Sequence, residues 1–327
     1  MGRRVKLVGV EAVYHCMSRT VAGARLFGDG EKEMLRRMLW QVSAFSGVEV
    51  LTYAVLSNHF HVLVRVPVAG RLSDAELVRR YRVLHPGPDP GAYGTLTADS
   101  LASVLARGGT EAAALRARLQ RRMGDVSEFM KTLKQRFSVW YNRSHGRYGT
   151  LWSERFKSVL VQGRGNPLQT MAAYIDLNPV RAGLVTDPKD YRFCGYAEAV
   201  AGLRRARDGL WRVWADRAGA ADGAAAALQM HRELVFAKGL GQARVAGRRE
   251  LLEALERGGR PLPKAAVLRC RVRYLSDGAV LGTAQFVREC CARAGAGRKR
   301  LPKPTPLAGA EWGDLAVMTN IRSRIFG

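Results

Sequence analysis

Two histidines with one apolar residue between them, His59 and His61, form the pattern in this chain that most directly indicates chemistry. They lie in residues 56–63, which read LSNHFHVL. Because side chains alternate between the two faces of a strand, both imidazoles would point to one side and Phe60 to the other. Two imidazoles on one face can bind a divalent metal ion, although the polar face of an ordinary strand would show the same pattern.

The residues around this pair predict the element that holds it. Residues 48–55 and 62–66 are rich in β-branched and aromatic side chains, which favour strands. Ser57 and Asn58 supply turn chemistry between them. We therefore expect a hairpin whose second strand begins with the histidines.

A second candidate segment, residues 171–183, carries a tyrosine and an asparagine. Tyr174 and Asn178 are four residues apart and would share one face of a helix, whereas Asp176 would point elsewhere. Pro179 disfavours helical geometry at Asn178 and suits the first turn of a new helix, so we expect a kink or restart with Asn178 as the cap. A core aromatic and a simple helix cap would explain the same two residues.

Together these segments resemble the HUH endonuclease superfamily, and within it the REP-associated tyrosine transposases, which are single-tyrosine, insertion-sequence-type transposases. Three further motifs fit that family, namely residues 14–19 (YHCMSR), 129–137 (FMKTLKQRF) and 149–158 (GTLWSERFKS). The five motifs occur in the family's order, and the resemblance covers about residues 8–200.

The resemblance implies metal-dependent cleavage of single-stranded DNA through a covalent 5′-phosphotyrosine, with Tyr174 as the nucleophile. A phenol ionises far more readily than an aliphatic alcohol, which suits that role near a cation. His59 and His61 would hold one divalent ion, with the amide oxygen of Asn178 as a candidate third ligand. This ligand set is uncharged, and the five cysteines show no zinc-ligand spacing, so we expect magnesium or manganese.

The composition predicts a nucleic-acid partner. The chain has 53 Lys and Arg against 28 Asp and Glu, a net charge of +25 and a pI near 10.7, so it will bind polyanions by counterion release. Basicity does not distinguish DNA from RNA, but the resemblance implies single-stranded or hairpin DNA near palindromic repeats. The candidate DNA-binding residues are Arg19, Lys131, Lys134, Arg136, Tyr148, Trp152, Arg155, Lys157 and Arg181.

Four of these candidates have a more specific expected contact. Tyr148 and Trp152 lie beside glycines in a predicted loop and could stack on bases. Arg155 and Lys157, on the following predicted strand, are the first candidates for phosphate contacts, although a solvated strand face would look the same.

The remaining histidines have weaker signals. His15 lies in the first motif and could be an auxiliary ligand or a phosphate contact, but the favoured interpretation is a buried imidazole hydrogen-bonded to the backbone. His85, His145 and His231 are expected in loops or on helix surfaces and receive no role.

The order of elements predicts an α+β fold, a ferredoxin-like antiparallel sheet with helices packed on one face, as in HUH nucleases. Residues 1–202 would form the catalytic domain with a helical insertion at about 68–125, and residues 203–327 a basic, mainly helical domain of uncertain role. Strands are expected at about 10–19, 48–66 (the hairpin) and 154–162. Helices are expected at about 31–46, 71–83, 96–123, 126–143, from 166 onward, and at 224–237, 246–257 and 284–294.

Two other functions fit parts of the pattern. A replication-initiator or relaxase-type HUH nickase shares the metal pair and the tyrosine, and a catalytically silent DNA-binding protein would share the fold. The context of the tyrosine, YIDLNPVRAG, argues against the first, and the complete set of four site residues argues against the second. Without a signal peptide or an apolar run of membrane-spanning length, we expect a cytoplasmic, chromosome-associated protein, with a preference for a monomer.

Overall fold

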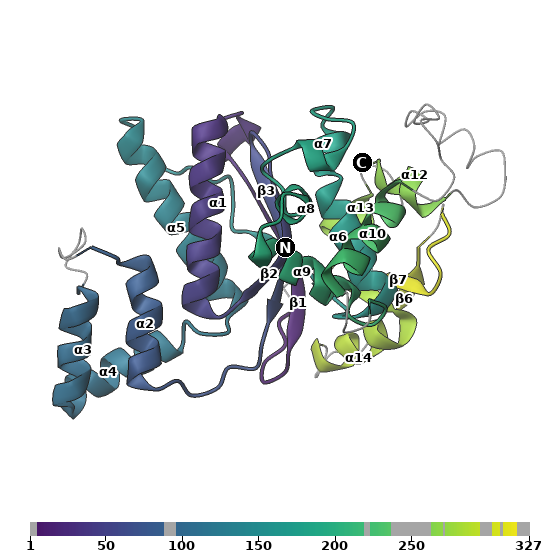
Figure 1. The fold of residues 1–327 in the computed structure, drawn as a ribbon. Coiled ribbons are helices and arrows are strands. Elements are labelled where there is room, and N and C mark those ends of the chain that lie inside the picture. Colours follow the sequence, from purple (N-terminus) through teal and green to yellow (C-terminus); the bar gives the residue numbers. More distant parts are fainter. Residues whose placement is uncertain are drawn as a thin grey trace.

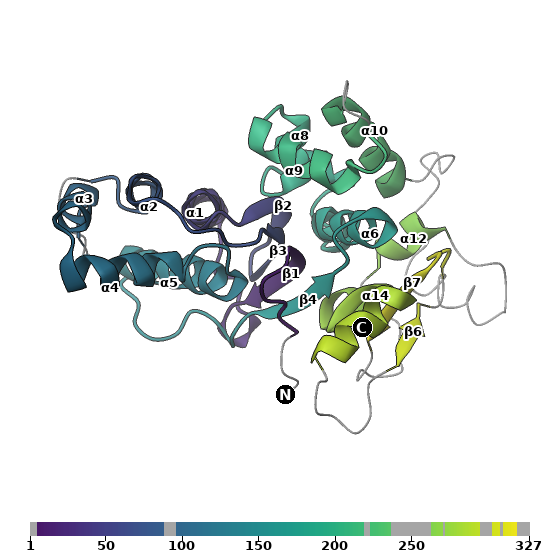
Figure 2. The same cartoon turned by 90° about the horizontal axis from the view of Figure 1, so that it is seen from below.

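A seven-stranded sheet with helices on both faces forms the centre of the protein (Figures 1 and 2). The computed structural model describes residues 5–87, 96–218, 223–236, 263–270, 272–294, 303–307 and 310–318. The order of the strands in the sheet is β2-β3-β1-β4-β5-β7-β6. The strands are β1 (Ala12–Arg19), β2 (Glu49–Val55), β3 (His59–Val66), β4 (Lys157–Val161), β5 (Val280–Thr283), β6 (Pro304–Pro306) and β7 (Leu315–Met318).

Helices connect these strands and cover the sheet. The N-terminal part contains α1 (Asp29–Ser46), α2 (Asp74–Leu84), α3 (Ala98–Arg107), α4 (Gly109–Gln120) and α5 (Val126–Ser144). After β4 follow α6 (Gly165–Asp176), α7 (Asn178–Arg181), α8 (Gly195–Val200), α9 (Arg204–Trp214) and α10 (Gly223–Phe236). The C-terminal part adds α12 (Lys264–Leu268), α13 (Arg273–Asp277) and α14 (Ala284–Ala294). The helix expected at 246–257 lies outside the described residues.

The first four strands have the expected antiparallel topology. Strand β3 lies between β1 and β2 and is antiparallel to both, so β1 and β2 are parallel strands joined through α1 with another strand between them. Strand β1 lies in the same way between β3 and β4, which α5 connects. This is a split βαβ arrangement repeated twice, as the sequence predicted.

The complete sheet differs from the prediction because C-terminal residues extend it. Strand β5 pairs with β4 in parallel, and β7 and β6 continue the sheet in antiparallel pairs, so the sheet is mixed. The segment after residue 203 therefore contributes three strands as well as helices. These strands have three or four residues each, too few to show an alternating pattern in the sequence. A domain boundary near residue 203 stays a prediction.

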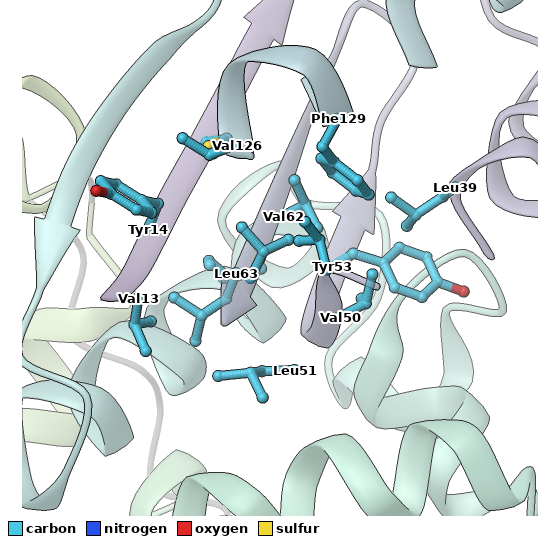
Figure 3. Packing of buried hydrophobic residues seen from close by; sticks show 14 of the residues in the cluster. Val13, Tyr14, Leu39, Val50, Leu51, Tyr53, Val62, Leu63, Val126 and Phe129 are labelled. Atoms are coloured by element: carbon cyan, nitrogen blue, oxygen red, sulfur yellow. The ribbon is translucent and has the colours of Figure 1, made fainter. Parts of the chain in front are cut away.

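Helices also cover both faces of the sheet, whereas one covered face was expected. Helices α1 and α5 pack together over one face, and α6 and α9 cover the other, where both contact β2 (Figure 2). Figure 3 shows the core between the sheet and the first layer, in which Val62 of β3 lies near Phe129 of α5 and Leu39 of α1. Leu51 lies on the opposite side of the sheet in the same view. Because side chains alternate along a strand, β2 and β3 together send apolar side chains into both layers.

The helical insertion packs at the edge of the first helix layer. Helix α2 contacts α1, and α3 and α4 contact α2 farther from the sheet (Figure 1). The single helix expected at 96–123 is two helices, because Gly108 and Gly109 have φ angles of +72° and +81°. These left-handed conformations interrupt a right-handed helix and suit glycine. Among the described residues, no helix has the length and apolar character needed to cross a membrane.

Candidate nucleic-acid cleavage site

The two histidines lie at the start of β3, as predicted, on the face of the sheet that α6 covers. In the pairing of β1 with β3, His59 stands opposite Arg19 and His61 opposite Met17. Their rings are perpendicular, with centroids 5.1 Å apart. Phe60 points to the other face, where its ring packs 5.6 Å from that of Trp152. The alternation of the strand therefore places both imidazoles together.

Helix α6 brings Tyr174 to these imidazoles. The Tyr174 ring centroid lies 6.4 Å from that of His61 and 6.2 Å from that of His15 on β1. The side chain of Tyr174 is 2% exposed, but it borders a cavity of about 980 Å³ that His59, His61 and Asn178 also line. Four residues from three segments of the chain thus meet at one cavity.

Asn178 lies at the junction of α6 and α7 but does not cap α7 as expected. The N-cap residue is Leu177, and the side-chain nitrogen of Asn178 donates to the backbone oxygens of Ile175 (3.0 Å) and Tyr174 (3.4 Å). The reason is that α6 ends here with carbonyl groups that need donors. With the amide nitrogen held by the backbone, the amide oxygen of Asn178 is the atom that can act as a ligand.

His61 belongs to a buried chain of hydrogen bonds with His15 and the backbone of α13. His15 is fully buried, and its Nδ1 lies 2.9 Å from the backbone oxygen of Leu275 in α13. Its Nε2 lies 2.8 Å from Nδ1 of His61. Burial lowers the pKa of His15 to about 4 and holds the pKa of His61 well below its usual range, with His15 and His59 lowering it further. Both rings are therefore neutral at pH 7.

His59 has a corresponding contact on its own side. Its Nδ1 lies 2.6 Å from Oδ1 of Asn58, whose nitrogen donates to the backbone oxygen of Gly23 at 2.9 Å. Because that donation fixes the orientation of the Asn58 amide, Oδ1 accepts a hydrogen bond from the N–H at Nδ1 of His59. Nε2 is then the nitrogen through which His59 could bind a metal ion.

The donor set fits a divalent ion of intermediate or hard character. In the described part of the chain, no group of three or more His, Cys, Asp or Glu side chains is placed to hold a metal. The predicted ligands, the two imidazoles and the oxygen of Asn178, all line the cavity, and this set would leave positions for water or phosphate oxygens. His15 is not an auxiliary ligand, because both of its ring nitrogens are hydrogen-bonded. The favoured interpretation of a buried, backbone-bonded imidazole is correct.

Arg181 contacts the tyrosine more closely than was expected for a DNA-binding residue. Its guanidinium carbon lies 4.0 Å from the centroid of the Tyr174 ring, and Nη2 donates to the Tyr174 backbone oxygen at 2.6 Å. Nη1 donates to the backbone oxygen of Leu268 at 2.7 Å. A cation in this position, against the face of the ring, would favour negative charge on the phenol oxygen.

Cationic side chains also line the cavity, together with the carboxylates of Glu154 and Asp277 and with apolar residues. Four of the predicted DNA-binding residues are among its lining residues: Arg19, Arg155, Lys157 and Arg181. Lys157 is half-exposed and lies 3.2 Å from the carboxylate of Glu154. An exposed pair of this kind is weak and can open when a phosphate group competes for the lysine.

Three other predicted contacts do not line this cavity. Lys131 is exposed on α5 and pairs with Glu128 at 3.4 Å. Lys134 donates to the backbone oxygen of Glu154 at 2.7 Å. Arg136 donates to the backbone oxygen of Leu84 at 3.0 Å, near the insertion, and burial lowers its pKa.

The two aromatic candidates differ sharply in exposure. Tyr148 is 94% exposed in the loop between α5 and β4, where its ring is open to a base. Trp152 is 8% exposed, and its ring packs among Phe27, Phe60 and Phe137. The prediction that Trp152 stacks on a base is therefore wrong, because the apolar core already contacts its ring.

Sequence reasoning missed the contribution of the C-terminal segment to this site. Arg269, Cys270, Ser276 and Asp277 line the same cavity, and Leu275 supplies the carbonyl that bonds His15. These residues follow α12 or belong to α13, and no motif in their sequence indicates a site. A signal could have come only from contacts between distant segments.

Helix α6 also carries a second polar cluster, the Asp176 cluster, formed by Asp176, Thr52, His231 and Trp214. The hydroxyl of Thr52 donates to Asp176 Oδ1 at 2.6 Å, and His231 Nε2 lies 3.0 Å from Asp176 Oδ2. The indole of Trp214 donates to His231 Nδ1 at 3.3 Å. Asp176 and His231 are fully buried, so the expectation of a surface position for His231 is wrong. His231 lies on α10, and the packing of α10 onto α6 and α9 buries this side chain.

Comparisons with known proteins find similarity in structure. No family model matches the chain, and no curated protein matches it. Among solved structures, the chain is similar to a REP-associated tyrosine transposase bound to a REP hairpin. The sequence identity is 16%, the TM-score is 0.40, and the match covers 62% of this chain and 86% of that chain. A similarity of this size carries no argument about chemistry, so the function must be argued from the residues of the site.

Proposed function

We propose that the protein is a metal-dependent endonuclease and strand transferase for single-stranded DNA, a transposase that acts through Tyr174. The observation that carries the proposal is the meeting of His59, His61, Tyr174 and Asn178 at one cavity lined by cationic side chains. Two imidazoles, an amide oxygen and a phenol are the groups that metal-assisted attack on a phosphodiester requires.

The residues divide the reaction between them. His59, His61 and Asn178 would hold a magnesium or manganese ion, which when bound supplies Lewis-acid activation of the scissile phosphate. The phenol oxygen of Tyr174 attacks phosphorus, the bond to the 3′ oxygen breaks, and the phenol proton is lost while the leaving oxygen gains one. Arg181 stabilises the charge that develops on the phenol. A 5′-phosphotyrosine and a free 3′-hydroxyl result.

Strand transfer follows from the same chemistry in reverse. A different 3′-hydroxyl attacks the phosphotyrosine and releases Tyr174, so strands are rejoined without ATP because the phosphodiester energy is retained. The substrate that we propose is DNA with hairpin-forming palindromic repeats, on the basis of the resemblance of the motifs in this sequence. All four site residues come from one chain, which supports a monomeric enzyme, and light scattering in solution tests this.

A cleavage assay tests the function directly. The protein is incubated with hairpin oligonucleotides that carry single-stranded flanks, in magnesium or manganese, and covalent adducts are separated under denaturing conditions. We expect an adduct with the wild-type protein and none with Tyr174→Phe, while the affinity for DNA stays within a few fold because only a hydroxyl is lost. Tyr148→Phe is the matched control, since Tyr148 is a fully accessible phenol, and this variant should keep the adduct.

The same assay separates the alternatives. An adduct that persists in Tyr174→Phe and disappears in Tyr148→Phe would assign the nucleophile to the exposed phenol instead. DNA binding by the wild-type protein without any adduct would indicate a catalytically silent binder. Cleavage at one fixed sequence without a hairpin would indicate a replication-initiator or relaxase-type nickase.

A further inference from the structure

A buried relay connects the C-terminal segment to one of the proposed metal ligands. It consists of the backbone oxygen of Leu275, the ring of His15 and the ring of His61, joined by contacts of 2.9 Å and 2.8 Å. His15 and Leu275 are fully buried, and His61 is 6% exposed. No step of the proposed reaction uses His15, although it is among the most enclosed polar side chains of the protein.

The direction of the protons in this relay is determined by its first member. A carbonyl oxygen can only accept a hydrogen bond, so Nδ1 of His15 carries the proton of that ring. A neutral imidazole has one N–H, and Nε2 of His15 must therefore accept from His61. The proton of His61 is then on Nδ1, and the lone pair is on Nε2.

This assignment matters because a histidine can bind a metal only through a nitrogen with a lone pair. An unconstrained neutral histidine prefers the opposite tautomer, with its proton on Nε2. The hydrogen bond that His61 donates to His15 therefore selects for His61 the form that can bind a metal through Nε2. Partners of this kind commonly orient and tune metal-binding histidines, and their loss costs 10- to 100-fold in metal affinity.

We propose that His15 is a positioning residue that, anchored on the Leu275 carbonyl, holds His61 in its metal-binding tautomer. The inference rests on the proposed function for the identity of His61 as a ligand. It adds that the C-terminal segment is part of the cleavage site, through a backbone carbonyl that no side-chain motif could reveal. His15 acts through His61 and touches neither DNA nor metal.

Nitrogen NMR of the metal-free protein tests the tautomer without any activity measurement. In protein labelled with ¹⁵N-histidine, a ring nitrogen that carries a proton is distinguished from one with a lone pair by its chemical shift. We expect His61 in the wild type to have a protonated Nδ1 and an unprotonated Nε2. His15→Phe and His15→Leu should shift His61 toward the Nε2-protonated form. His15→Gln should preserve the wild-type form, since its amide can accept from His61 and donate to Leu275.

Manganese binding provides the second measurement. The dissociation constant for Mn²⁺, followed by electron paramagnetic resonance, should rise 10- to 100-fold in His15→Phe or His15→Leu and only a few fold in His15→Gln. His231→Gln is the matched control, because it alters another fully buried histidine that has no contact with the relay. This control should leave the His61 tautomer unchanged.

The two measurements separate the possible failures. A His61 signal that is unchanged in both His15→Phe and His15→Leu would overturn this inference, whatever the metal affinity. A wild-type protein with the expected tautomer but no Mn²⁺ binding would contradict the proposed function instead. Two apolar variants guard against misfolding of one of them, and circular dichroism establishes which is folded.

Discussion

Helix α6 carries two polar clusters whose access to solvent differs. Tyr174 faces the cavity of about 980 Å³ together with the histidines of β3. Asp176, two residues farther along, faces the Asp176 cluster, in which it and His231 are fully buried. Both clusters contain histidine and an acidic or phenolic group, but no residue of the Asp176 cluster lines this cavity.

The difference shows that buried ionisable groups do not by themselves indicate a functional site. The Asp176 cluster joins β2, α6 and α10 through Thr52, Asp176 and His231, and it has the features of a structural link. The cavity has similar polar groups, but Arg19, Arg155, Lys157 and Arg181 line it as well. Access to this cavity distinguishes the two clusters.

Loss of a cavity histidine should have the largest effect. His59→Ala or His61→Ala removes half of the imidazole ligands, so we expect no detectable DNA cleavage at any practical manganese concentration. His231→Ala, in the Asp176 cluster, should cleave at nearly the wild-type rate at low temperature despite lower stability. Gel assays of nicking measure both. Equal loss of cleavage in the two clusters would remove the distinction between them.

Asp176→Ala should have the largest effect on stability. It leaves the buried Thr52 hydroxyl without its acceptor, so the free energy of unfolding should fall by about 1 to 3 kcal/mol. Urea denaturation measures this. Asp208→Ala, which removes an exposed carboxylate 3.9 Å from Arg204, should change it by less than about 0.5 kcal/mol. A small effect of Asp176→Ala would mean that this cluster does not hold the helices together.

Acid should destabilise the histidine side of α6. Burial lowers the folded-state pKa of His15 from the ordinary 6.5 to about 4. Between these two pH values, His15 is protonated in the unfolded chain and neutral in the folded protein. The free energy of unfolding is therefore unaffected by His15 above pH 6.5, and it falls as the pH drops from 6.5 toward 4. Between pH 7 and 5 this histidine should cost about 2 kcal/mol of unfolding free energy. His15→Gln should show a weaker pH dependence, and identical curves would contradict the assignment.

The smallest predicted effect concerns salt. Lys157→Ala should reduce the slope of log Kd for DNA against log salt by about one ion, because Lys157 borders the cavity. Lys131→Ala should leave the slope unchanged, since Lys131 is not among the residues that line it. Filter binding at several salt concentrations measures both slopes. Equal slopes for the two variants would show that the cavity is not where the backbone of DNA binds.

The hairpin, the paired histidines and the Tyr174 helix could be predicted because local periodicity determines them. Alternation along β3 places His59 and His61 on one face, and helical spacing brings Tyr174 and Asn178 together. The same local reasoning failed for Trp152, because its burial depends on rings from Phe27 and other distant segments.

The remaining part of the site depends on contacts that no local pattern encodes. Leu275 and Leu268 take part through backbone oxygens, which any residue possesses, so their side chains contain no information about the role. The sequence around His231 did not indicate burial. Its burial results from the packing of α10 against α6 and α9, which come earlier in the chain. Tertiary packing decided each of these cases.

The contact between His15 and the carbonyl of Leu275 has a consequence for the order in which the site is completed during synthesis. Leu275 is 260 positions after His15. At ribosomal rates of about 5 to 20 residues per second, Leu275 is synthesised roughly 10 to 50 s after His15. If His15 positions His61 as proposed, a nascent polypeptide stays a poor nuclease until the segment around Leu275 has been made and has packed against His15.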